Sequence, residues 1–172
     1  ETGFSKAHEA LAVLDEPHVD EPDVAATVHD SLANLYFFLG MYAQSFEHSN
    51  LGIEYARKAG ATRVEAYCLR NLAVIYSEQR EFDRSRQLYR ESRQLFESID
   101  YRIGIAWTLH GVGEIEFEEG RLEQALDYFE RVLNAVTEEE FGMRYASARN
   151  GVARTLWRLG RLEEALSWID QA

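Results

Sequence analysis

The stretch that decides the fold is Ala106-Trp107-Thr108-Leu109-His110-Gly111-Val112-Gly113, with Gly120-Arg121-Leu122-Glu123-Gln124-Ala125-Leu126-Asp127-Tyr128-Phe129 shortly after it. Its small residues recur along the chain at intervals of 40 residues, in these columns: Ala26, Ala66, Ala106 and Ala146; Ala33, Ala73, Gly113 and Ala153; Ser45, Ser85, Ala125 and Ala165. A turn column has the same interval: Gly40, Arg80, Gly120 and Gly160. The chain therefore contains four copies of an internal repeat.

Close helix packing explains why these positions are small. Apolar residues spaced three and four apart on both sides of each turn indicate two amphipathic helices. Small side chains let the axes of such helices approach, and glycine at the turn accepts a backbone conformation that other residues resist. Each copy is thus predicted to be an antiparallel helix pair.

The composition excludes several classes of protein. A formal net charge of −12 disfavours duplex nucleic acid and anionic membrane surfaces as partners. Cys68 is the only cysteine, so no internal disulfide can form, and we expect a buried apolar role for it. No apolar run reaches the roughly 20 residues that cross a bilayer. We expect a cytoplasmic chain without a cofactor.

The repeat resembles the tetratricopeptide repeat family, especially through Gly113, Gly120, Ala125 and Phe129. The resemblance implies an all-α fold, a right-handed α-solenoid (superhelix) of antiparallel helix pairs. The 40-residue unit is similar to the long repeats of bacterial signal-responsive regulators. Two departures are notable, because Arg80 replaces the turn glycine and Glu116 stands where an aromatic residue is usual.

We expect one tetratricopeptide-like domain over residues 1–172, and a fragment of a longer protein. Residues 1–14 are expected to be the second helix of a truncated repeat. The helix pairs are predicted at 23–59, 62–99, 102–137 and 142–171. The run Glu138-Glu139-Glu140 is expected to be a solvated connection between helices.

The resemblance implies that the first helix of each pair lines a concave groove. The candidate partner-binding residues on these helices are Asp30, Asn34, Tyr67, Arg70, Trp107, His110, Glu114, Asn150, Arg154 and Arg158. Glu114 and Glu118 are expected to form salt bridges with Arg154 and Arg158 of the next repeat, with an anion clamp made by these two arginines as the alternative. Trp107 and Tyr67 are either anchors for a partner or packing between repeats. Phe37, Phe117 and Trp157 are expected in the core.

The chain carries no recognisable catalytic motif, and its histidines lack the spacing of a metal site. The leading hypothesis is a non-catalytic scaffold that binds a protein or peptide, within a larger regulatory protein. The alternative is an effector-sensing domain of a bacterial transcription regulator or signalling ATPase, with a pocket near His110 and Trp107. Solenoid ends without a polar cap could also associate with each other.

Overall fold

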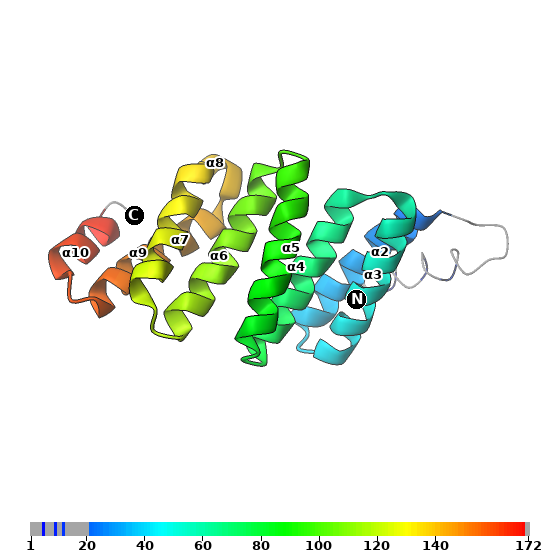
Figure 1. Ribbon diagram of the computed structural model, residues 1–172, viewed down its shortest axis with the longest axis horizontal. Helices are drawn as coiled ribbons and strands as arrows, with labels where there is room; N and C mark the ends of the chain where they lie inside the picture. The colour runs from blue at the N-terminus through cyan, green and yellow to red at the C-terminus, as the bar shows by residue number, and fades with distance from the viewer. Residues whose placement is uncertain (1–4, 6–8, 10–11, 13–20, 171–172) are drawn as a thin grey trace. The chain divides into compact units, whose positions relative to one another are not determined.

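The computed structural model describes residues 21–170 together with Ser5, Glu9 and Ala12 (Figure 1). Those three residues are helical, and the rest of the range 1–14 lies outside the described residues. The described part of the chain consists of helices and turns and contains no strand. Its contacts divide the chain into two compact units, residues 1–99 and 100–172. The single domain over residues 1–172 stays a prediction.

The first unit holds two antiparallel helix pairs in its described residues. Helix α2 (Pro22–Phe38) packs on α3 (Tyr42–Ala59), and α4 (Thr62–Glu78) packs on α5 (Phe82–Ser98). The pairs are stacked, because α4 lies against both α3 and α2 (Figure 1). The first helices of successive pairs are therefore neighbours, and side chains can meet across them.

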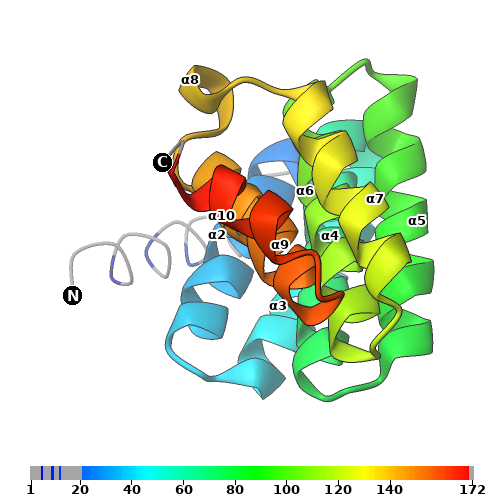
Figure 2. The same cartoon turned by 90° about the vertical axis from the view of Figure 1, so that its left-hand side faces the viewer.

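The second unit repeats this arrangement. Helix α6 (Arg102–Glu118) packs on α7 (Leu122–Ala135), and α9 (Met143–Arg158) packs on α10 (Leu162–Asp170). Helix α9 also covers α7 and touches α6. Figure 2 shows α10 lying along α9. The short helix α8 (Glu138–Phe141) precedes α9 in the chain. The fold is thus all-α, built from consecutive helix pairs of the solenoid type.

The small columns of the sequence mark the contact between the two helices of a pair. Ala33 and Ala73 are fully buried on the first helices. The Ser45 hydroxyl donates to the carbonyl of Ala33 at 2.7 Å, and the Ser85 hydroxyl donates to that of Ala73 at 2.6 Å. A larger side chain at either position would push the axes apart, so the columns stay small.

The turns between paired helices are alike in all four copies. Gly40, Gly120 and Gly160 have φ between 72° and 78°, and Arg80 has φ 61° at the equivalent place. The next backbone N–H closes the helix by a bond to a carbonyl five residues earlier, as from Glu81 to Tyr76 at 2.9 Å. This is the helix-ending motif that needs a left-handed residue.

The connection after α7 matches the prediction in part. Glu138, Glu139 and Glu140 are exposed, as expected, but they form a helical turn, α8. Thr137 caps it: its hydroxyl accepts from the Glu140 backbone N–H, and the Glu140 carboxylate accepts from the Thr137 N–H. Two polar groups at the helix start are satisfied reciprocally, which stabilises helix there. Phe141 then anchors the turn in the core.

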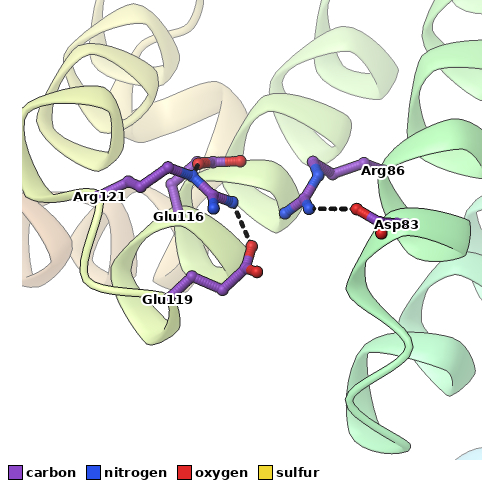
Figure 3. A network of polar contacts seen from close by, with 5 residues as sticks. All are labelled: Asp83, Arg86, Glu116, Glu119 and Arg121. Atoms are coloured by element: carbon purple, nitrogen blue, oxygen red, sulfur yellow. Dashed lines mark hydrogen bonds and ion pairs between the residues drawn. The ribbon is translucent and has the colours of Figure 1, made fainter.

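Glu116 occupies a buried position of α6, where the first two copies have Tyr36 and Tyr76. Its carboxylate accepts from the guanidinium of Arg121, which also donates to Glu119 (Figure 3). The ion pair of Glu116 with Arg121 explains how a carboxylate replaces an aromatic ring at this repeat position.

Figure 3 also shows a contact on α5, where Arg86 donates to Asp83 at 2.6 Å.

None of the helices in residues 21–170 is both long and apolar enough to cross a membrane.

Candidate binding site

In the first unit, α2 and α4 share a network of polar side chains. The Asn71 amide donates to Asp30 Oδ1 at 2.9 Å, and the Asn34 amide donates to the same oxygen at 3.3 Å. The Arg70 guanidinium donates to Asn71 Oδ1 at 2.7 Å and to Asn34 Oδ1 at 3.4 Å. The structure thus brings together three predicted site residues, Asp30, Asn34 and Arg70.

Burial makes the carboxyl group of Asp30 a weaker acid than usual. Desolvation raises the pKa of its carboxyl to about 6, although Arg70 and the hydrogen bonds from Asn71, Cys68 and Asn34 act in the opposite direction. Desolvation wins because an ionised carboxylate loses hydration on burial. Asp30 therefore changes charge in mildly acidic solution, within the electrostatic influence of Arg70.

Asn71 is the member of this network that the sequence analysis missed. It is buried on α4, next to Arg70. A polar amide one helical turn from the apolar Cys68 and Ile75 could have identified it, because buried amides need hydrogen-bond partners.

Tyr67 lies outside the network. Its ring meets the buried ring of Phe96 edge to face, with centroids 5.2 Å apart. This contact lies within the α4–α5 pair, so it is neither of the two roles considered for Tyr67, an anchor for a partner or packing between repeats.

In the second unit, α6 and α9 are joined by a salt bridge between Glu114 and Arg154, the expected pairing between repeats. The Arg154 guanidinium also lies over the Phe117 ring, 4.1 Å from its centroid. Arg158 lies over the same ring at 4.7 Å and donates to the Phe117 carbonyl at 3.1 Å. Phe117 is half-buried between these arginines and the core.

His110 lies one helical turn before Glu114 on α6. Its Nε2 is 3.1 Å from the Ser147 hydroxyl of α9 and 3.8 Å from the Glu114 carboxylate. Desolvation lowers the pKa of the imidazole, Glu114 acts in the opposite direction, and Arg144 and Arg154 lower it further. His110 is accordingly a neutral hydrogen-bonding group at pH 7.

Trp107 is half-buried against the cluster around Leu109 and Phe141. The Phe141 ring is 6.4 Å away between centroids, and the Arg144 guanidinium lies 5.6 Å from the Trp107 ring. The packing role considered for Trp107 is therefore the one this geometry favours.

Asn150 and Arg154 also line a cavity of about 700 Å³ between α9 and α10. Trp157 is part of its wall and is 65 % exposed, so its expected core position was wrong. The effector-sensing alternative expects a pocket near His110 and Trp107. Neither of these residues lines this cavity.

The described residues contain no group of three or more His, Cys, Asp or Glu side chains placed to hold a metal ion. Cys68 is fully buried, and burial raises the pKa of its thiol, so the reactive thiolate is suppressed. The polar groups can donate and accept hydrogen bonds, and the arginines can bind carboxylates.

Stacked helix pairs with a row of half-buried polar side chains on the first helices define a helical-hairpin repeat protein. The chain belongs to the tetratricopeptide repeat family, whose sequence model matches residues 23–98 and 104–172. Comparison of the sequence with curated proteins gave no match.

Several solved structures share the fold. BtubC (BKLC) from P. vanneervenii is 20% identical with a TM-score of 0.82, covering 99% of this chain and 70% of its own. NprR, solved with its cognate peptide NprX, is 22% identical with a TM-score of 0.81, covering 99% and 49%. Aspartyl phosphate phosphatase F from Bacillus subtilis is 14% identical with a TM-score of 0.86, covering 98% and 44%. The chain thus spans about half of the latter two proteins.

Proposed function

We propose that this chain is a scaffold that binds a protein or peptide along the first helices of its pairs. The observation that carries the proposal is the polar network of Asp30, Asn34, Arg70 and Asn71, which two successive first helices build together. Amide and guanidinium groups at such a place can bind the main chain and carboxylates of an extended peptide. In the second unit, His110 and Arg154 offer the same chemistry.

We further propose that the chain is non-catalytic. Its fold is compatible with either role, since the structural neighbours include a peptide complex and a protein named as a phosphatase. The thiol of Cys68 is a poor nucleophile candidate, because it is buried and burial raises its pKa, which suppresses the thiolate. A cytoplasmic location remains a prediction from the sequence.

A random-peptide phage library, panned on the purified chain, supplies a ligand with which to test the proposal. The selected peptide is then titrated calorimetrically into the wild type and into Asn34→Ala and Arg70→Ala. We expect each substitution to weaken binding by about tenfold, the equivalent of one charge-assisted hydrogen bond.

Arg57→Ala is the matched control, because Arg57 is an exposed arginine on the second helix α3 that pairs with Glu65. It should leave the affinity unchanged. Failure to enrich any peptide, or equal affinity in all variants, would contradict binding along the first helices.

A further inference from the structure

The turn between α2 and α3 exposes apolar side chains. Phe38 is 78 % exposed, Leu39 57 % and Met41 38 %. The rings of Phe37 and Phe38 meet edge to face with centroids 6.0 Å apart, and the Tyr42 ring lies 5.6 Å from that of Phe37. These residues form one patch, which we name the apolar turn. Exposed apolar surface that gathers in one place marks a site of interaction.

Neighbouring helix pairs do not cover this part of a repeat. At the positions of Phe38, Leu39 and Met41, the second and third copies have only polar or charged side chains: Glu78, Gln79, Glu81, Glu118, Glu119 and Arg121. Glu78 and Gln79 are exposed although α2 and α3 precede them in the same unit, and Glu118 and Glu119 are exposed although α9 and α10 follow. A helix pair on either side thus leaves the turn in solvent. The exposure of Phe38 and Leu39 therefore comes from their position in the turn.

The helix pair that carries the apolar turn is acidic. From Glu21 to Ala56 the sequence has no Lys or Arg. Its acidic residues over this range are Glu21, Asp23, Asp30, Glu47 and Glu54. The first basic residues, Arg57 and Lys58, lie at the other end of α3. A partner of the apolar turn therefore meets negative charge around the apolar side chains.

Two exposed carboxylates flank the apolar turn. Glu47 follows Phe46 on α3, and the Phe46 ring meets the Tyr76 ring of α4 edge to face, with centroids 5.9 Å apart. The end of α4 thus lies beside the start of α3, which brings Glu78 next to the apolar turn. Neither Glu47 nor Glu78 has a basic partner among the contacts of the described residues. Both can therefore pair with the cations of a ligand.

Apolar side chains at an exposed turn can enter a membrane or contact a protein. Anionic lipid head groups would repel Glu47 and Glu78, and this helix pair has no Lys or Arg before Arg57 to attract them. A protein segment that carries Lys or Arg beside apolar side chains is complementary to the patch in both respects. Charge therefore favours a basic protein segment as the occupant.

We propose that the apolar turn is a docking site for a basic segment of a partner protein. Bulky apolar side chains of that segment pack on Phe38 and Leu39, and its Lys or Arg side chains pair with Glu47 and Glu78. This site goes beyond the function proposed above, because the polar network between α2 and α4 takes no part in it.

A random-peptide phage library tests the chemistry of the partner. The library is first depleted on the double variant Phe38→Ser with Leu39→Ser and then panned on the wild type, so that only peptides that need the apolar turn remain. Both side chains are exposed, so the double variant should keep the circular dichroism and melting temperature of the wild type. We expect the enriched peptides to contain bulky apolar residues and more Lys and Arg than Asp and Glu.

Fluorescence anisotropy of an enriched peptide then compares variants of the full chain. Phe38→Ser should weaken binding by about tenfold, because it removes a bulky apolar contact. Glu78→Gln should weaken binding by about two- to threefold at low salt, and high salt should abolish this difference, because exposed ion pairs are weak and screened.

Matched controls lie in the second unit. Met143→Ser changes an apolar side chain that is 91 % exposed, and Glu139→Gln removes an exposed carboxylate. Neither should alter the affinity. Arg70→Ala should not alter it either, so this binding and the binding proposed above can fail independently of each other.

Several results would overturn the proposal. If no peptide survived the depletion, or if Phe38→Ser bound as tightly as the wild type, the apolar turn would not be a docking site for a protein segment. Enriched peptides rich in Asp and Glu would contradict the charge of the partner. Sedimentation of the wild type, but not of the double variant, with phosphatidylcholine vesicles would assign the turn to a membrane. Dimerisation in analytical ultracentrifugation that the double variant lacks would assign it to a second copy.

Discussion

Arg80 holds a left-handed backbone conformation, with φ 61°, at a turn where the other three copies have glycine. This conformation costs a residue with a Cβ atom roughly 1 kcal/mol or more. We therefore expect Arg80→Gly to raise the free energy of unfolding by about 1 kcal/mol in a denaturant titration. The substitution also removes the contact of Arg80 with the Phe82 ring at 5.1 Å. Gly120→Ala should instead lower the free energy of unfolding. If Arg80→Gly were less stable than the wild type, the contact with the Phe82 ring would outweigh the backbone strain.

Asp30 makes the stability of the first unit depend on pH. Its pKa is raised from 3.8 to about 6 in the folded chain, so between these values the folded state binds more protons than the unfolded one. Stability should therefore fall as the pH rises from about 4 to about 6, by at most about 3 kcal/mol for a shift of this size. Asp30→Asn removes the ionisation, and we expect a flatter profile with greater stability at pH 7.

Thermal unfolding measured across this pH range tests the Asp30 prediction. Asp23→Asn, an exposed carboxylate of the same helix, should keep the wild-type profile. An Asp30→Asn variant that keeps the same pH dependence would show that another group is responsible.

At the scale of the element, α6 tolerates a buried carboxylate because the turn that follows supplies Arg121. Removing one partner of a buried ion pair leaves an uncompensated charge. Arg121→Ala should thus lower the free energy of unfolding by about 2 to 3 kcal/mol, somewhat reduced because Arg121 is 38% exposed. The double variant Glu116→Leu with Arg121→Ala should recover most of this loss, since Leu156 fills the equivalent place of α9.

Denaturant unfolding of the two single variants and the double variant completes this cycle. If the double variant were as unstable as Arg121→Ala, the loss would come from the turn itself and not from the carboxylate of Glu116.

The elements also show how far the sequence could predict the structure. The columns of small residues predicted the helix pairs, because a position such as Ala33 or Ser45 stays small only where two axes touch. The capped turn α8 was missed because its stabilising contacts join Thr137 and Glu140 within one turn and leave no trace in the 40-residue pattern. Trp157 was assigned to the core because the equivalent position, Phe117, looks buried from sequence alone.

The candidate site was predictable in part. The columns placed Asp30, Asn34 and Arg70 on neighbouring first helices, and Glu114 opposite Arg154. They could not show that Asn71 completes the first network or that Tyr67 turns toward Phe96. Those details depend on side-chain directions around each helix, which a spacing of 40 residues does not determine.

Across the molecule, the two helices of each pair are expected to have different roles. Second helices hold the pairs together through buried side chains such as Phe96 and Phe129. We propose that the first helices carry the polar groups that recognise a partner. A bound peptide should therefore alter the first helices of the unit that binds it and leave the second helices largely unchanged.

Hydrogen–deuterium exchange of the chain with and without its library-selected peptide distinguishes these roles. We expect slower exchange in α2 and α4, or in α6 and α9, with α3, α5 and α7 unaffected, because only segments in contact with ligand gain protection. Protection confined to the second helices, or no change at a saturating peptide concentration, would contradict a binding scaffold built on the first helices.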